Sequence, residues 1–198
     1  MDITCKISDI CNKGQGLVAI QNIFSNTVIF REQPVITFTN FDDAVEKYKF
    51  LPSVTKKRIH KLSNEHPYLG DLLGIIKTNS LDILSNTLSC KSLCLMLSRI
   101  NHSCSPNSEI LWDHIKREHV LHSIKHIPSG TEICISYRIH LQQHNIRERL
   151  KEIRKTFGFR CACEHCKCLS ILSSQKDMRI KYSKFNVLSH YYNMINIF

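Results

Sequence analysis

Two short stretches decide the fold of this chain: Asn101-His102-Ser103-Cys104-Ser105-Pro106-Asn107 and Cys161-Ala162-Cys163-Glu164-His165-Cys166. The second stretch places three thiols within six residues. Zinc binds four ligands in a tetrahedron, and thiolates are among its preferred ligands. The spacing therefore predicts one structural zinc ion held by Cys161, Cys163 and Cys166, with a fourth ligand still to be found.

The fourth ligand has three candidates, which are Cys104, Cys168 and His165. Cys104 lies in a loop-like setting beside Pro106, and its ligation would close a loop of more than fifty residues, a large conformational constraint. His165 is more simply interpreted as an exposed spacer. Free cysteines or a redox pair remain the alternative to a metal.

The composition indicates a folded chain of 198 residues with one substantial core. The first residues carry charge where a signal peptide would be apolar, so we expect no secretion and no disulfide framework for the ten cysteines. Residues 17–30 belong to the longest uncharged stretch, but polar side chains interrupt it, and it does not predict a membrane span. We expect a monomer in the nucleus, the cytoplasm or both.

The positive charge is concentrated near the end of the chain. Residues 138–184 hold 12 Lys and Arg against 4 Asp and Glu, which is +8 of the formal net charge of +10. One interpretation is a solvated basic helix. The other is a surface for an acidic partner, either a nucleosome, direct nucleic-acid contact or an acidic protein.

The hydrophobic pattern predicts a mainly β protein with helices, an α+β class. Turns are expected at residues 13–16 and 128–131. Ser53 is a plausible helix N-cap, and Ile146, Leu150, Ile153 and Phe157 give the last helix an apolar face. Strands are expected at residues 3–7, 17–20, 27–30, 35–38, 108–112, 119–124 and 132–137, and helices at 42–50, 53–62, 90–97 and 145–157, with one or two short helices after 169.

Several of these stretches occur in an order that resembles the SET-domain lysine methyltransferases, nearest to the SMYD branch and its fungal relatives that lack the MYND finger. Asn101 to Asn107 matches the SET signature, and Phe157 to Cys166 resembles the post-SET element. The other matching stretches are Lys13-Gly14-Gln15-Gly16-Leu17-Val18-Ala19, Asn79-Ser80 and Gly130-Thr131-Glu132-Ile133-Cys134-Ile135-Ser136-Tyr137. Unlike SMYD proteins, the chain has no cysteine between Cys11 and Cys90 to build a MYND finger.

The resemblance implies a SET-domain fold of small curved β-sheets with a pseudoknot and a zinc-binding post-SET element. It divides the chain into a SET domain over 1–140 with a helical insert at about 42–100, a post-SET helix and zinc cluster over 141–168, and a short C-terminal helical tail over 169–198. In such proteins the post-SET element packs on the Asn-His-Ser-Cys loop, so the resemblance implies Cys104 as the fourth zinc ligand.

The same resemblance implies an S-adenosylmethionine-dependent protein-lysine N-methyltransferase, with histones as one candidate substrate. The alternative is a catalytically weak SET scaffold that binds protein or nucleic acid. Tyr137 would be the catalytic tyrosine, and Leu81, Tyr137 and Phe157 would line the lysine channel. The implied cofactor-binding residues are Lys13, Gly14, Gln15, Gly16, Asn79, Asn101, His102, Tyr137 and Phe159.

Five of these residues also have plainer interpretations. Tyr137 could be a core tyrosine, His102 an ordinary turn histidine, Lys13 a surface lysine, Phe159 a residue that only packs beside the zinc, and Asn79 a helix cap. Since Leu81 and Phe157 replace aromatic residues common at the channel, the number of methyl groups added stays open.

Overall fold

The computed structural model describes residues 4–83, 90–137, 146–164 and 166. The chain divides into two compact units, residues 1–166 and 167–198, and the second lies outside the described residues. The tail helices expected after residue 169, together with His165 and Cys168, therefore lie outside the described part.

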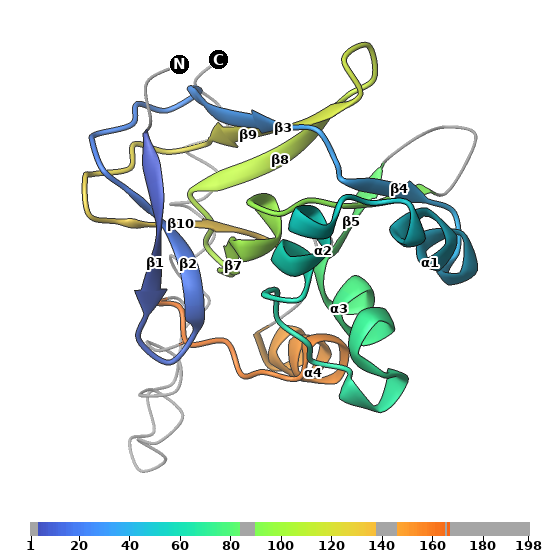
Figure 1. Ribbon diagram of the computed structural model, residues 1–198. Helices are drawn as coiled ribbons and strands as arrows, with labels where there is room; N and C mark the ends of the chain where they lie inside the picture. Colours follow the sequence, from blue (N-terminus) through green and yellow to red (C-terminus); the bar gives the residue numbers. More distant parts are fainter. Residues whose placement is uncertain (1–3, 84–89, 138–145, 165, 167–198) are drawn as a thin grey trace. The chain divides into compact units, whose positions relative to one another are not determined.

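Within the described residues, ten short strands form three small sheets (Figure 1). One parallel pair stands out among antiparallel neighbours, because β10 places Cys134 beside Asn101 and Ile135 beside His102 of β7. This pairing brings the Asn-His stretch next to the strand that leads to Tyr137. The sheets are β1 (Cys5–Ile10), β2 (Gly14–Ala19), β10 (Glu132–Ile135) and β7 (Asn101–His102); β3 (Val28–Glu32), β9 (Glu118–Ser123) and β8 (Ser108–Asp113); and β4 (Ile36–Phe38), β6 (Cys90–Leu93) and β5 (Ser80–Ile83).

Three helices form the insert between β4 and β5. They are α1 (Phe41–Lys49), α2 (Ser53–Ile59) and α3 (Asp71–Asn79), with the short 3-10 helix η1 (Pro67–Leu69) before α3. Asn40 caps α1, because its side chain accepts a hydrogen bond from the Asp43 N–H at 2.9 Å. Figure 1 shows these helices beside the β4–β6–β5 sheet, with which they share one apolar core.

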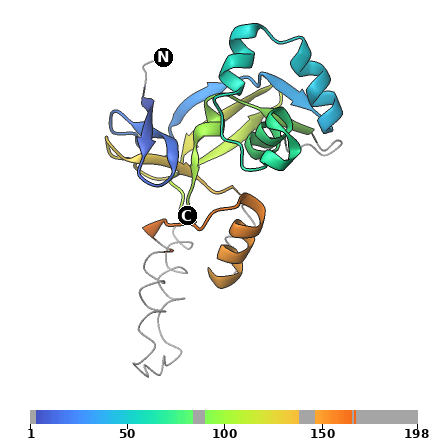
Figure 2. The same ribbon diagram turned by 60° about the horizontal axis from the view of Figure 1, so that its bottom comes forward.

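The apolar residues gather in three clusters. The first joins β2, β9 and β10 and includes the fully buried Leu17, Leu121 and Ile133. The second joins β4 and β6 to the insert helices. The third is small and centres on Ile153 of α4 (Ile146–Phe157), which packs against Cys104, Cys161 and Cys166. In Figure 2, α4 lies apart from the insert helices. None of the described helices has the length and apolar character that crossing a membrane requires.

Most of the strands and helices expected from the sequence are present, but three local predictions are wrong and one helix was not predicted. Residues 90–97 are not a helix but strand β6 followed by the 3-10 helix η2 (Leu97–Arg99). Since β6 lies between β4 and β5 and is buried at Ser92 and Leu93, its sequence lacks the alternation that marks an exposed strand. The turn expected at 13–16 lies at 11–13, and both glycines belong to β2.

The other two errors concern the insert. Ser53 is the first residue of α2, and Pro52, which has no side chain for capping, occupies the cap position. Helix α3 escaped prediction because Gly74 interrupts its apolar pattern. A Cβ at Gly74 would lie 2.2 Å from Asn64 Oδ1, so the glycine permits a close approach between α3 and the preceding loop.

A buried histidine links the second and third sheets. His119 of β9 is 1% exposed, and its Nε2 lies 2.6 Å from Ser92 Oγ of β6, while its ring packs edge-on against Trp112. Burial lowers the pKa of His119 from 6.5 to about 4. The neutral ring is therefore part of the folded structure.

We expect the pKa of His119 to make the fold acid-sensitive. Between pH 6.5 and 4 the unfolded chain binds a proton at this residue that the folded chain does not, so stability falls as the pH falls, by up to about 3 kcal/mol. His119→Gln should flatten this dependence while lowering stability at pH 8. Urea unfolding at pH steps from 8 to 5 measures both effects. His122→Gln, on the same strand, is the matched control, and an unchanged slope in His119→Gln would contradict the prediction.

Candidate active site and metal centre

A half-buried carboxylate on β10 joins two of the sequence-predicted residues, Lys13 and Asn101. Glu132, on β10, accepts hydrogen bonds from Lys13 Nζ at 2.6 Å and from Asn101 Nδ2 at 2.8 Å. Asn101 Nδ2 also lies 3.3 Å from the carbonyl oxygen of Gln15. The pKa of Lys13 is raised above its usual value because the ion pair with Glu132 outweighs desolvation. Lys13 is therefore paired with Glu132, a residue that was not a site candidate in the sequence.

Gly16 allows this close approach. A Cβ at residue 16 would lie 2.7 Å from Ile10 Cγ1, 2.8 Å from Asn101 Nδ2 and 3.1 Å from Glu132 Oε1. Any side chain there would push Asn101 or Glu132 aside. Gly14 meets a different demand, because its φ of +70° favours glycine although the space around it is open. Each glycine therefore has its own physical reason.

An open cavity of about 510 Å³ lies beside this junction, lined by Ile7, Gln15, Lys61, Ser63 and Arg99. The guanidinium of Arg99 donates a hydrogen bond to the side-chain oxygen of Gln15. Desolvation and the nearby positive charge of Arg58 lower the pKa of Arg99. Lys61 and Arg99 make this cavity a favourable place for an anionic group. Neither was a sequence candidate, since each is remote in sequence from the Gly-x-Gly strand.

His102 is held as a neutral ring. It is 4% exposed, its Nδ1 accepts the backbone N–H of Tyr137 at 3.2 Å, and its Nε2 lies 3.3 Å from Cys104 Sγ. Because Nδ1 is an acceptor, the remaining ring proton belongs on Nε2, facing the sulfur. Burial lowers the pKa of His102 to about 4. One side chain thus joins the Tyr137 backbone to the cysteine cluster.

Tyr137 stands in an aromatic cluster with its hydroxyl fixed. The hydroxyl donates a hydrogen bond to the Ile100 carbonyl at 2.9 Å. The ring centroid lies 5.3 Å from that of His102, 5.1 Å from Phe157 and 6.3 Å from Phe159. Although the residue is 36% exposed, burial raises the pKa of its phenol, and nearby acidic groups raise it further. The hydroxyl therefore stays protonated at neutral pH.

Two residues predicted from the sequence, Asn79 and Leu81, are not part of the aromatic cluster around Tyr137. Asn79 ends α3, and its amide donates hydrogen bonds to the carbonyls of Ser63 and Ile75, both at 2.7 Å. The bond to Ser63 ties the end of α3 to the preceding loop, and a role of Asn79 in cofactor binding stays a prediction. Leu81 lies on β5 and packs partly buried against the first core cluster.

The four predicted zinc ligands converge. The sulfur atoms of Cys104, Cys161, Cys163 and Cys166 all lie within 4.8 Å of one another. Cys104 Sγ is 3.8 Å from that of Cys161 and 3.5 Å from that of Cys166. A tetrahedron with zinc–sulfur bonds of about 2.3 Å has sulfur–sulfur edges of about 3.8 Å. The cluster is therefore a group that could hold one metal ion.

The pKa shifts of the thiols in this cluster also suit a bound metal ion. Hydrogen bonds from Cys104 and Cys161 lower the pKa of Cys163, whereas the hydrogen bond to Cys161 raises that of Cys104. Burial raises the pKa of Cys166 to about 12. A second thiolate would be repelled by the first, so four ionised sulfurs require a compensating cation. Helix α4 covers the cluster with Leu150, Ile153 and Phe157, as its apolar spacing predicts.

Comparison with known proteins agrees with this arrangement. The SET domain model matches residues 14–138, which is more than half of the chain. Histone-lysine N-methyltransferase set5 of Schizosaccharomyces pombe is 34% identical over 165 residues, covering 81% of this chain and 50% of the relative. Histone-lysine N-methyltransferase Smyd1 of Mus musculus is 27% identical over 114 residues, covering 50% and 23%.

Among solved structures, CpSET8 from Cryptosporidium gives a TM-score of 0.45 at 17% identity, covering 67% of this chain and 56% of that one. The chain spans half the length of the Schizosaccharomyces relative. The family match carries the assignment, and it confirms the resemblance seen in the sequence and the expected SET-domain fold. The chain belongs to the SET-domain family.

Proposed function

We propose that this chain is an S-adenosylmethionine-dependent protein-lysine N-methyltransferase. The observation that carries the proposal is the Tyr137 hydroxyl, held on the Ile100 carbonyl directly beside Asn101 and His102. S-adenosylmethionine supplies a methyl group on a positively charged sulfur. The described residues then have to bind that cofactor, exclude water and orient an amine.

The residues around the cavity suit the two ends of this cofactor. Arg99 and Lys61, with the amide of Gln15, offer cations and a donor to a carboxylate. We infer that Arg99 rather than Lys13 binds the cofactor's carboxylate, because Lys13 is paired with Glu132. Phe159, whose ring lies 6.0 Å from that of His102, offers an aromatic face to the adenine. Gly14 and Gly16 keep the backbone beside the cavity free of side chains.

The aromatic cluster suits a lysine side chain. Tyr137 and Phe157, with Leu81 proposed as a third wall, would surround the methylene chain and desolvate the amine. Desolvation lowers a lysine pKa, normally near 10.4, and so favours the neutral nucleophile. Since the Tyr137 phenol is protonated, it acts as a hydrogen-bonding and orienting group rather than as a base.

We propose that Cys104, Cys161, Cys163 and Cys166 bind one structural zinc ion. The sulfur–sulfur distances and the all-thiolate donor set support zinc over harder metals. Zinc would hold the post-SET segment against residue 104. The Nε2–H of His102 would then donate to a ligand sulfur, which is a common way of orienting a metal ligand.

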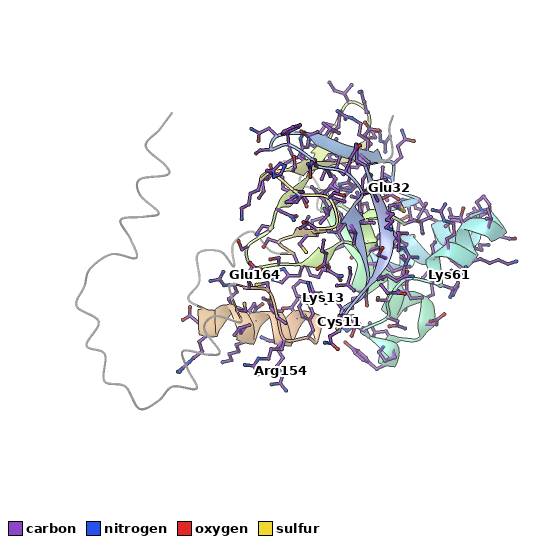
Figure 3. The ribbon with its side chains drawn as sticks, turned by 90° about the vertical axis from the view of Figure 1, so that its left-hand side faces the viewer. Cys11, Lys13, Glu32, Lys61, Arg154 and Glu164 are labelled. Atoms are coloured by element: carbon purple, nitrogen blue, oxygen red, sulfur yellow. The ribbon has the colours of Figure 1, made fainter. Side chains whose placement is uncertain are left out.

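The substrate is proposed to be a protein, with histones suggested by the names of the relatives, and the location nuclear or cytoplasmic. The outer face of α4 is basic, which supports the proposal that the chain binds an acidic partner. Its exposed cations recur every three or four residues, and Figure 3 shows Arg154 on this outer side. The cations at this spacing are Arg147, Lys151 and Arg154, and the exposed Lys155 lies next to Arg154. Only residues 146–164 and 166 of the basic segment 138–184 are described.

The function is tested by binding and transfer together. Purified protein should bind S-adenosylmethionine by calorimetry and transfer labelled methyl groups to histones or extract proteins, with the modified lysines located by mass spectrometry. Gly16→Ala should weaken cofactor binding at least about tenfold, because its Cβ displaces Asn101 or Glu132. Gly130→Ala is the control for general backbone strain, since its φ of +82° disfavours alanine but its Cβ would have no atom within 4 Å.

The competing function, a SET scaffold that binds partners without turnover, predicts a different outcome. Cofactor binding without transfer to any protein would favour the scaffold. Absence of cofactor binding in the wild-type protein would contradict both the enzyme and the cavity assignment.

A further inference from the structure

A single carboxylate at the end of β3 binds three successive backbone amides that lie more than sixty residues away in the sequence. Glu32 Oε1 accepts the N–H of Leu95 at 2.7 Å and of Met96 at 3.0 Å. Glu32 Oε2 accepts the N–H of Leu97 at 2.9 Å, with Met96 also at 3.2 Å. Figure 3 labels Glu32, which is half-buried.

These amides need such an acceptor. Strand β6 ends at Leu93 and η2 begins at Leu97, so the first N–H groups of the turn have no partner in either element. Leu95 is 5% exposed and Leu97 1%, which keeps water from them. Met96, the residue at the N-cap position of η2, makes no capping hydrogen bond with its own side chain. Converging amides favour an anion, and Glu32 provides the negative charge that a local Ser or Asp cap provides elsewhere.

The turn that Glu32 holds leads directly into the proposed cofactor site. Met96 and Leu97 accept the backbone N–H groups of Arg99 and Ile100 at 3.0 and 3.1 Å. Ile100 then presents the carbonyl that receives the Tyr137 hydroxyl, and Asn101 presents the amide that meets Glu132. Three groups of the site therefore lie within four residues of the anchored amides: the Arg99 side chain, the Ile100 carbonyl and the Asn101 amide.

We infer that Glu32 is a positioning residue of this site. It acts through η2 to fix the Ile100 carbonyl, and hence the Tyr137 hydroxyl, together with Arg99 and Asn101. It touches neither the cofactor nor the substrate, and the inference rests on the proposed function for its effect on binding. The carboxylate is also close enough to Cys94 that its negative charge, after burial, raises the pKa of that thiol.

The charge and both oxygens matter for this role. Glu32→Gln replaces one acceptor oxygen with an NH2 group that faces other N–H donors, so two contacts are lost or repelled. Glu32→Asp keeps the charge but shortens the side chain by one methylene. Its hydrogen bonds to the three amides should therefore be weaker than those of Glu32 and stronger than those of the Gln variant. Glu118→Gln is the matched control. It removes the Glu118 carboxylate of the neighbouring strand β9, which pairs with Arg31 at 3.0 Å and makes no hydrogen bond to η2 within the described residues.

The test measures the anchor and the site separately. Hydrogen exchange at the amides of Leu95, Met96 and Leu97 should quicken about tenfold or more in Glu32→Gln and not in Glu118→Gln. Affinity for S-adenosylmethionine, from calorimetry, should fall about tenfold in Glu32→Gln and less than about twofold in Glu118→Gln, with Glu32→Asp between. Circular dichroism compares the folded fraction of each variant.

The outcomes separate this inference from the proposed function. If the wild type fails to bind the cofactor, the proposed function fails while the exchange measurement still decides whether Glu32 anchors η2. Faster exchange with unchanged cofactor affinity would overturn the positioning role. Should Glu32→Gln not fold, Glu32→Asp carries the same comparison, and full wild-type affinity with quickened exchange in that variant would overturn it equally.

Discussion

Tyr137→Phe is expected to abolish methyl transfer almost completely while leaving the cofactor bound. We expect the rate of transfer at saturating substrate to fall at least about a hundredfold, the loss typical when one preorganised hydrogen-bonding group is removed. Affinity for S-adenosylmethionine should change less than about threefold. Calorimetry and a labelled-methyl assay on the same preparations measure the two quantities.

The structure gives the reason for this separation. Phenylalanine keeps the ring contacts of Tyr137 with His102, Phe157 and Phe159, so the walls of the site remain. It loses only the hydroxyl that sits 2.9 Å from the Ile100 carbonyl. That carbonyl becomes an acceptor without its partner, and the amine loses the polar group that would orient it. The loss should therefore appear in kcat more than in KM.

Tyr68→Phe is the matched control for this change. Tyr68 is 73% exposed, and its hydroxyl contacts the imidazole ring of His66 and the ammonium group of Lys77. Removal of this hydroxyl should leave methyl transfer unaltered. Equal activity in Tyr137→Phe and the wild type would contradict the role of the hydroxyl. Equal loss in both variants would point to a general effect on the fold.

The sequence predicted those parts of the site that local chemistry determines. Cys161, Cys163 and Cys166 lie within six residues, and the structure places their sulfur atoms together with that of Cys104. The α4 face of Leu150, Ile153 and Phe157 follows from helical spacing, and it packs as expected. A short motif can indicate such features because the residues that interact are also neighbours in the chain.

Long-range partners could not be predicted in the same way. Glu132 meets Lys13 across 119 residues and Glu32 meets Leu95 across 63, and neither distance leaves a periodic pattern. Lys13 was predicted to bind the cofactor, and its ion pair with Glu132 could not be inferred from the sequence. The helix expected over 90–97 failed for a related reason, since only the neighbouring strands β4 and β5 make β6 a strand.

Removal of zinc is expected to lower both stability and cofactor affinity. The purified protein should contain about one zinc ion per chain, and chelation should lower the midpoint of thermal unfolding by at least about 10 °C, since structural zinc contributes folding free energy directly. Cys104→Ser should bind zinc at least about a hundredfold more weakly. Cys11→Ser, which removes an exposed thiol outside the cluster, is the control. Full zinc retention by Cys104→Ser would instead make Cys168 or His165 the fourth ligand.

Cofactor affinity should fall together with zinc because the metal ligands and the proposed cofactor residues share short segments of chain. Cys104 lies two residues after His102, and Cys161 two residues after Phe159, whose ring packs 6.0 Å from that of His102. Loss of the metal frees both segments at once, and we expect at least a tenfold weaker affinity for S-adenosylmethionine. Trp112, the one tryptophan in the chain, lies in the second sheet beside His119. Its fluorescence therefore separates two outcomes, because an unchanged signal with weakened cofactor binding indicates local coupling through His102 and Phe159, whereas a parallel loss of both indicates that the whole domain unfolds.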